Sequence, residues 1–287
     1  MELRHIATRA GRLSTFLKQE LGLSTGLMNK LKWSEKLYVN GIPQHADFGV
    51  QIGDVITADL DEPAPDYPAE EEDITILYED AHILVVDKPA GMLIHPSRSR
   101  LTGTLANRVI GYYQRTGQKC AFHPITRLDR DTFGIVLLAK NAHIHGVLNG
   151  FHTEGKIQKT YHALVFGGPE QNSGIIDAPI ARRELPSLLR YVNQDGKPSL
   201  TEYTVLERNG PITKLALRPI TGRTHQLRVH CAYMGWPILG DPQYGSEASQ
   251  ALSETMGLST QLLCAKRLSF PHPISGKPMV LLSQLDT

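Results

Sequence analysis

The sequence predicts an α+β protein in which a mixed, mostly antiparallel central sheet is flanked by helices and preceded by a small α+β module. Strand-like segments dominate the chain after residue 74 and few helical segments separate them, which disfavours a doubly wound parallel sheet. The first 60 residues carry a helical and hairpin pattern of their own. We therefore expect a domain at 1–60, a linker at 61–73 and a large domain at 74–287.

Charge is distributed unevenly along the chain, although the formal total is only +1. Residues 59–73 hold eight acidic side chains and no basic one, whereas residues 1–58 carry a net charge of +2 and residues 74–287 one of +7. Like charges repel, and Pro63, Pro65 and Pro68 stiffen the chain, so we expect an extended, poorly packed linker. Two basic folded parts suggest a polyanionic partner.

Composition disfavours several classes of protein. No apolar run reaches the roughly 18–20 residues of a membrane helix, and the charged first ten residues are unlike a signal peptide. Cys120, Cys231 and Cys264 form no CxxC pair and the histidines lack metal-ligand spacing, so we expect neither a disulfide framework nor a metal site. No Walker loop or dinucleotide fingerprint is present. We expect a soluble, cytoplasmic monomer without a cofactor.

The first part of the chain predicts two short helices followed by a hairpin. Its helical apolar stripes are Leu13, Phe16, Leu17 and Leu21, then Leu27, Met28 and Leu31 after a capping Ser24 or Thr25. Short strands are expected at 37–39 and 55–58, with a turn at Asn40-Gly41.

This layout resembles the αL RNA-binding module of a ribosomal small-subunit protein, through residues 12–17, 39–41 and 53–56. The resemblance implies that basic helices contact RNA phosphates, which positions the protein without specifying sequence. The residues expected to make these contacts are Arg12, Lys30, Lys32 and Lys36. The alternative is a small structural domain with solvated lysines.

The large domain alternates many strands with three helices. Strands are expected at 74–78, 83–86, 135–139, 158–166, 175–180, 188–192, 200–207, 213–217, 262–270 and 279–285. Helices are expected at 104–113 and 141–151, and a third after an N-cap at Thr224.

A charged cluster at 126–134 lies directly before the apolar run 135–139. Arg127 and Arg130 flank Asp129, and Asp131 follows. A carboxylate beside a buried strand can be held in a fixed, partly desolvated position, as a nucleophilic or acid/base aspartate requires. The alternative is a charged turn whose surface ion pairs contribute little.

Two further segments hold candidate site residues. Alternation along 158–166 places Lys159 and Tyr161 on one strand face, which on its own also fits a solvated lysine and a half-buried tyrosine. Arg228 lies one helical turn after Thr224, beside an apolar stripe. An arginine there is either half-buried and paired, or extends its head to solvent.

Taken together, five stretches resemble the RluA-type pseudouridine synthases. They are KPAGMLIHP at 88–96, RLDRDT at 127–132 with Gly134, KTYHALV at 159–165, RPITGRTHQLRVH at 218–230 and AKRLSFPHP at 265–273. The resemblance implies a nucleophilic aspartate, Asp129, a base-supporting Tyr161, an Arg228 that pairs with the aspartate, and an Arg127 that helps displace the base. Further substrate contacts are expected from Lys159, Arg223, His225 and Gln226. Arg130 and Asp131 are expected only to form a local pair.

The resemblance implies isomerisation of uridine to its carbon-linked isomer on a base flipped out of the RNA. Ribosomal RNA is the first candidate substrate and transfer RNA the second; a non-catalytic RNA-binding or ribosome-assembly protein is the alternative class. A carboxylate hydrolase is disfavoured because Asp131, two residues from Asp129, does not straddle a bond as paired acids must. Thr126 and Phe133 depart from the family pattern, which usually has His and Ser there, and they bear on substrate fit.

Overall fold

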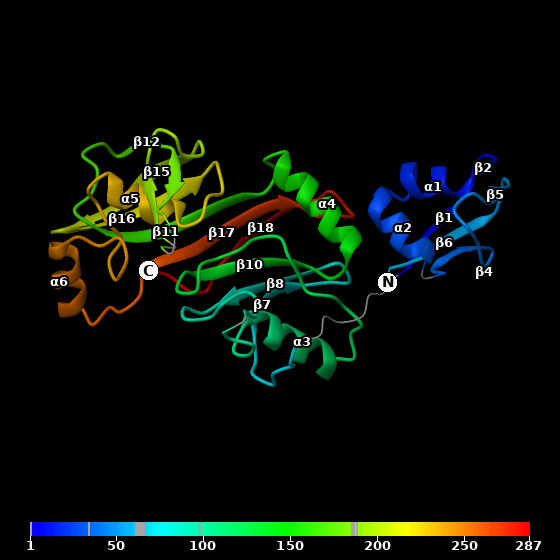
Figure 1. Cartoon of the computed structure of the whole chain (residues 1–287), viewed down its shortest axis with the longest axis horizontal. Coiled ribbons are helices and arrows are strands. Elements are labelled where there is room, and N and C mark those ends of the chain that lie inside the picture. Colours follow the sequence, from blue (N-terminus) through cyan, green and yellow to red (C-terminus); the bar gives the residue numbers. More distant parts are fainter. Residues whose placement is uncertain (1, 34, 61–66, 98, 185–186, 188) are drawn as a thin grey trace.

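The computed structural model of the chain describes residues 2–33, 35–60, 67–97, 99–184, 187 and 189–287. Figure 1 shows a small α+β module at one end of an elongated molecule and a long sheet that runs away from it. Within the described residues, no helix is both long and apolar enough to cross a bilayer.

The small module has its own sheet and its own core. Its four-stranded sheet has the order β1-β6-β3-β4, and β2 pairs with β5. The strand bounds are β1 Glu2–Ile6, β2 Gly11–Arg12, β3 Leu37–Val39, β4 Ile42–Pro43, β5 Gly49–Val50 and β6 Val55–Asp59. Helices α1 (Leu13–Gln19) and α2 (Thr25–Trp33) pack on this core through Leu17 and Leu31. The turn at Asn40 and Gly41 has positive φ at both residues, as its sequence predicts.

The long sheet has the order β12-β15-β16-β11-β17-β10-β8-β7, with β18 on β17 and β9 on β10. Its strands are β7 Thr75–Glu79, β8 Ile83–Lys88, β9 His123–Pro124, β10 Phe133–Ala139, β11 Gln158–Phe166, β12 Ser173–Asp177, β15 Leu200–Asn209, β16 Ile212–Pro219, β17 Leu263–Pro271 and β18 Pro278–Leu282. Only the β10–β17 pair is parallel among these described pairings. The expected mixed, mostly antiparallel α+β architecture is confirmed.

Helices cover both faces of the sheet around β8 and β10. Alternate residues of these strands, such as Val136 and Ile135, belong to two different apolar clusters. One cluster contains α3 (Leu105–Arg115), which Thr104 caps, and the other contains α4 (Ala142–Thr153), which Asn141 caps. A strand buried on both faces reads as an unbroken apolar run, which is why 83–86 and 135–139 were recognisable in the sequence.

The expectation of a poorly packed linker is wrong for residues 67–70, whereas residues 71–73 are exposed. The side chain of Asn107, on α3, donates to the Pro68 carbonyl at 2.7 Å, and the backbone N–H of Glu70 donates to the Asn107 carbonyl at 3.1 Å. The Tyr67 ring packs against the same core. Short-range charge repulsion is outweighed here by backbone hydrogen bonds to a helix. Residues 61–66 lie outside the described part of the chain.

Two other expectations differ from the structure. The strand expected at 175–180 is interrupted at Pro179, and β13 (Ile180–Arg182) pairs instead with β14 (Arg190–Val192), apart from the long sheet. Proline lacks the N–H that a sheet requires, which explains the break. Residue 188 of the expected strand 188–192 lies outside the described residues. Helix α6 (Glu247–Thr255) was not expected at all.

Candidate active site

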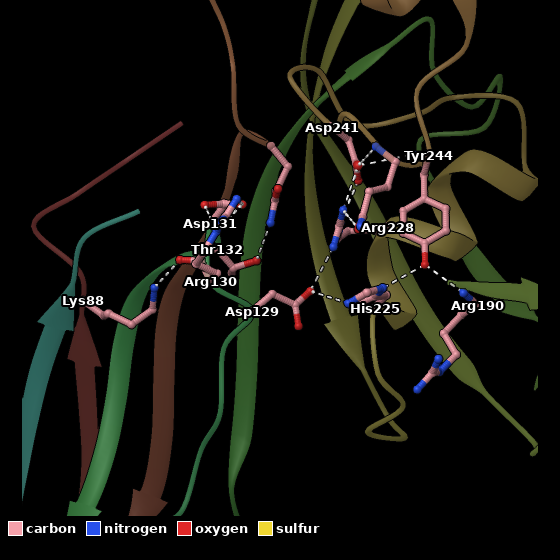
Figure 2. Close-up of polar contacts among 12 residues, drawn as sticks. Lys88, Asp129, Arg130, Asp131, Thr132, Arg190, His225, Arg228, Asp241 and Tyr244 are labelled. Atoms are coloured by element: carbon pink, nitrogen blue, oxygen red, sulfur yellow. Dashed lines mark hydrogen bonds and ion pairs between the residues drawn. The ribbon is translucent and has the colours of Figure 1, made fainter. Parts of the chain in front are cut away.

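Asp129 lies in the loop that leads from β9 into β10. Lys88, a fully buried side chain at the end of β8, contacts this loop. The Lys88 ammonium donates to the carbonyls of Pro89, Met92 and Arg130, each at 2.9 Å. Figure 2 shows the hydrogen bond to Arg130. Burial lowers the pKa of Lys88 to about 8, against the opposing effect of nearby carboxylates. This buried cation ties the loop to the sheet.

Gly134 lets the loop enter the sheet. Its φ is +108°, and a Cβ at this position would lie 2.5 Å from the carbonyl oxygen of Ala265 on β17. No other residue type fits both the backbone conformation and the close approach of the two strands. The beginning of β10 therefore lies directly against β17. This close approach restrains the loop that carries Asp129, five residues before Gly134.

Arg228 faces Asp129 from the other half of the sheet. It lies on α5 (Gln226–Tyr233) and is only 4% exposed. Its Nε and Nη2 donate to the carboxylate of Asp241 at 2.7 and 2.8 Å, and its Nη1 lies 3.4 Å from Oδ2 of Asp129 (Figure 2). Gln243 accepts a further hydrogen bond from Nη2 at 2.8 Å. The guanidinium therefore joins two carboxylates, and Asp241 is the more tightly bound of them.

His225 lies between Asp129 and Tyr244. Its backbone is left-handed, with φ +57°, at the residue before α5. Its Nδ1 lies 2.8 Å from the Tyr244 hydroxyl, and its Nε2 lies 3.9 Å from Oδ2 of Asp129. The same hydroxyl accepts from the backbone N–H of Arg190, so we assign its own proton to Nδ1 and the imidazole proton to Nε2. This tautomer directs an N–H at the aspartate.

The expected N-cap at Thr224 is wrong. Helix α5 begins at Gln226 after His225, and no side chain caps it. A non-glycine residue with positive φ is uncommon and occurs mainly where surrounding contacts hold it, and Tyr244 supplies such a contact here.

Tyr161 and Lys159 both line the cavity beside Asp129, as their shared strand face predicts. The cavity has a volume of about 340 Å³, and Arg127, His225 and Arg228 also line it. Burial, together with the charge of Asp129, raises the pKa of Tyr161, so its hydroxyl keeps its proton. Burial lowers the pKa of Lys159. The cavity thus combines one carboxylate, one aromatic ring and several cations.

Comparison with known proteins identifies the family of this chain. The family model described as RNA pseudouridylate synthase matches residues 82–233. The chain belongs to this family. The match spans Asp129, Tyr161 and Arg228, which lie in three separate segments of the synthase.

Relatives cover almost the whole synthase. YjbO of Bacillus subtilis, an uncharacterized RNA pseudouridine synthase, is 36% identical over 91% of this chain and 90% of its own. A Vibrio cholerae protein named ribosomal large subunit pseudouridine synthase C is 32% identical over 96% of this chain and 90% of its own. Among solved structures, human RNA pseudouridylate synthase domain containing 1 has a TM-score of 0.62 at 27% identity, covering 76% of this chain and 86% of that one. The expected family, fold and enzyme class are confirmed.

Other expected substrate residues of the synthase differ in their surroundings. Arg127 is exposed, and Arg223 donates through Nε to the Pro198 carbonyl at 3.2 Å. The Gln226 amide is used within the protein: it donates to Leu200 and Thr201 and accepts from the Arg223 backbone, among others. Gln226 therefore shapes the wall of the cavity by holding its loop.

The residues expected to bind RNA phosphates lie in the small module. Arg12 precedes α1, and Lys30 and Lys32 lie in the last turn of α2; all three are exposed. Lys36 differs from them, because its ammonium lies 3.5 Å from the Asp59 carboxylate and is partly covered.

The two departures from the family pattern have structural roles. The hydroxyl of Thr126 is buried and accepts a hydrogen bond from the backbone N–H of Leu137 at 2.9 Å. Phe133 begins β10 and pairs in register with Cys264. Arg130 and Asp131 form the expected local pair, at 2.9 Å. Among the described residues, no three His, Cys, Asp or Glu side chains gather as metal ligands would.

Sequence reasoning missed four residues that hold the site: Lys88, Asp241, Gln243 and Tyr244. Lys88 lies within one of the matching stretches, but a lysine beside a proline gives no sign that it is buried. The segment 241–244 follows Gly240 in a loop without periodicity, so it carried no signal.

Proposed function

We propose that this synthase isomerises specific uridines of ribosomal RNA to pseudouridine, with Asp129 as the nucleophile. The observation that supports this most strongly is the carboxylate of Asp129, held 3.4 Å from a buried arginine in a cavity that Tyr161 also lines. An arginine beside a carboxylate favours its ionised form and fixes its direction, as nucleophilic attack requires.

The reaction breaks the bond between N1 of uracil and C1′ of ribose, turns the base, and joins C5 to C1′. C5 loses its proton and N1 gains one, so the product is an isomer of uridine. Oδ2 of Asp129 lies 3.4 Å from Nη1 of Arg228 and 3.9 Å from Nε2 of His225, so we take Oδ1 as the oxygen that attacks the sugar or the ring. Elimination to a glycal would use the same carboxylate as a base. All three routes need the ionised Asp129.

The target base must leave its stack before it can reach Asp129, at a cost of about a few kcal/mol. The cavity of about 340 Å³ is large enough for a single uracil ring, and Tyr161 offers an aromatic side chain to support it. We assign the displacement of the base to Arg127, which is exposed and also lines the cavity.

The preference for ribosomal RNA rests on the small module and on relatives such as the Vibrio cholerae enzyme, whose name gives the large ribosomal subunit. In this proposal, residues 1–60 form an RNA-binding domain that holds the substrate through Arg12, Lys30 and Lys32. The synthase acts in the cytoplasm as a monomer. Light scattering of the purified protein measures its oligomeric state. Mapping pseudouridines in total RNA from a strain lacking the gene decides between ribosomal and transfer RNA.

Tritium release from RNA labelled at C5 of uridine tests the chemistry. Wild type should release tritium, and Asp129→Asn should not, because an amide cannot serve as the nucleophile. Asp131→Asn removes a neighbouring carboxylate of the same loop and should retain release. Equal release by wild type and Asp129→Asn would refute the mechanism, and no release by wild type would favour a non-catalytic RNA-binding protein.

A further inference from the structure

Trp33 is the most exposed large apolar side chain among the described residues, at 84%. It is the last residue of α2, whose inward face is formed by Leu27 and Leu31. The core of the module is therefore complete without the indole. An indole is usually at least half covered, because it is the largest apolar side chain and gains most from burial.

Two lysines of α2 lie on the part of the helix that carries this ring. The Lys32 ammonium lies 5.9 Å from the centroid of the Trp33 ring. Lys30, three residues earlier on the helix, projects to the same side as Trp33. Helix α2 contains no acidic residue. We call Lys30, Lys32 and Trp33 together the Trp33 surface.

We propose that the Trp33 surface binds an unpaired RNA base, with the indole stacked on the base and the two lysines against the flanking phosphates. Every base has a flat π face, and stacking on an aromatic side chain is sequence-tolerant. A base within a continuous duplex has no free face. The surface therefore selects single-stranded segments and loops, beyond the phosphate contacts already proposed for the small module.

This inference rests on the proposed function in one respect: both take RNA as the ligand. It adds a contact with an RNA base, whereas the contacts proposed for Lys30 and Lys32 are with phosphates. The competing interpretation is that the lysines act alone, since cations in the last turn also stabilise a helix C-terminus. A stacked base and a purely ionic contact differ in two measurable ways.

The first measurement is tryptophan fluorescence of the full chain. The protein has two tryptophans, and Trp236 is only 5% exposed, so the signal that Trp33→Leu removes belongs to Trp33. A short single-stranded RNA should quench this signal, and a blunt duplex of the same length should quench it much less. An unchanged Trp33 signal at saturation, with saturation followed by the anisotropy of fluorescein-labelled RNA, would overturn the proposal.

The second measurement is the salt dependence of affinity. Trp33→Leu should weaken binding of the single strand by about fivefold or more, with an unchanged slope of log K against log salt, because no charge is lost. The double variant Lys30→Gln/Lys32→Gln should lower the magnitude of that slope by about 1.4, since each contact to a single strand contributes about 0.7. Trp33→Tyr should restore most of the affinity.

Wild-type affinity in Trp33→Leu would overturn the stacking proposal, and so would equal loss for single strand and duplex. A protein that binds the Trp33 surface more tightly than RNA does would also overturn the stacking proposal. These outcomes are separate from the fate of the proposed function. Tritium release by the wild type tests the isomerase, whatever Trp33 contributes to binding.

Discussion

Arg228 donates two hydrogen bonds to the Asp241 carboxylate, at 2.7 and 2.8 Å, whereas Asp129 lies 3.4 Å from its remaining nitrogen. The guanidinium is therefore held by a carboxylate that takes no part in the proposed reaction. When Asp129 gives up its charge on attack, Arg228 still has a full partner. The cation is positioned before the substrate arrives, which is the arrangement that electrostatic catalysis favours.

We expect Asp241→Ala to lower the free energy of unfolding by about 3–5 kcal/mol, because it leaves a buried arginine without its main partner. The Asp241 side chain is 1% exposed. Glu202→Ala is the matched control: it removes the partner of Arg218, which is 41% exposed, and should cost at most about 1 kcal/mol. Urea unfolding of the three proteins measures this. Equal effects of the two substitutions would contradict the structural role of Asp241.

The double variant Arg228→Met/Asp241→Leu separates stability from catalysis. It removes both buried charges, so it should be more stable than Asp241→Ala. It should nevertheless release no more tritium, because the Asp129 carboxylate has lost the cation that lies 3.4 Å from it. Recovery of activity together with stability would show that Arg228 acts only in folding.

Lys88 predicts a pH dependence of stability. Its pKa is lowered from 10.5 to about 8 in the folded chain, so between these pH values the unfolded chain binds more protons at this side chain. Its contribution to stability therefore rises with pH across this window, by at most about 1.4 kcal/mol per pH unit. We expect the stability gap between wild type and Lys88→Met to widen from pH 8 to pH 10.5.

Urea unfolding at several pH values measures that gap. Lys88→Met should be the less stable protein throughout, because three carbonyls lose their donor, at about 1–3 kcal/mol for each buried group left unpaired. Lys277→Met, at an exposed position, is the control and should show no widening. A gap that is independent of pH would mean that Lys88 keeps an ordinary pKa.

Tyr244→Phe tests the assigned tautomer of His225. Without the hydroxyl, nothing directs the imidazole proton to Nε2, and the N–H that faces Asp129 is no longer assured. We expect kcat to fall roughly tenfold, the equivalent of about 1.4 kcal/mol, with little change in KM, because the contact is with the proposed nucleophile and not with RNA.

The nitrogen-15 NMR spectrum of the histidine rings gives a second measurement, since it distinguishes the two tautomers directly. Tyr191→Phe is the control, because it removes a surface hydroxyl whose one hydrogen bond among the described residues is with Asn193. It should change neither kcat nor the spectrum of His225. An unaltered His225 tautomer in Tyr244→Phe would remove the basis of this prediction.

Gly134→Ala should destabilise the chain by about 3 kcal/mol or more, because the new Cβ meets the Ala265 backbone and the φ of +108° is strained for alanine. Gly257→Ala is the control, with φ +67° and nothing within 4 Å of the new Cβ. It should cost about 1–2 kcal/mol. Thermal or urea unfolding compares the two, and similar losses would mean that β10 can move away from β17.

Sequence reasoning succeeded where local pattern and local chemistry coincide. The double-sided burial of β8 and β10 left unbroken apolar runs, and the strand alternation that placed Lys159 beside Tyr161 is confirmed by the cavity they share. It failed where tertiary contacts decide. His225 takes a left-handed conformation that no local sequence pattern predicts. Asp241 contacts Arg228 through the tertiary fold of the loop that follows α5.

The linker shows the same limit. Acidic and proline residues predicted a loose tether, but the carbonyl of Pro68 accepts a hydrogen bond from Asn107, and the backbone N–H of Glu70 donates to that residue. Composition describes a segment in isolation, whereas the outcome depends on whether a helix elsewhere leaves donors and acceptors for it. The parallel pairing of β10 with β17 is likewise invisible in sequence, since the strands lie far apart in the chain.

Strand β17 is synthesised after the candidate site residues, although it lies inside the sheet. It lies between β11 and β10 in the sheet, and its two ends belong to the two apolar clusters on either side, through Leu263 and Leu268. A ribosome synthesises Asp129 and Arg228 before it synthesises β17. The nascent protein therefore contains both residues before it contains the strand that connects the two parts of the sheet. Isomerase activity should therefore appear only after β17 has been synthesised, and a chain ending before Leu263 should be inert.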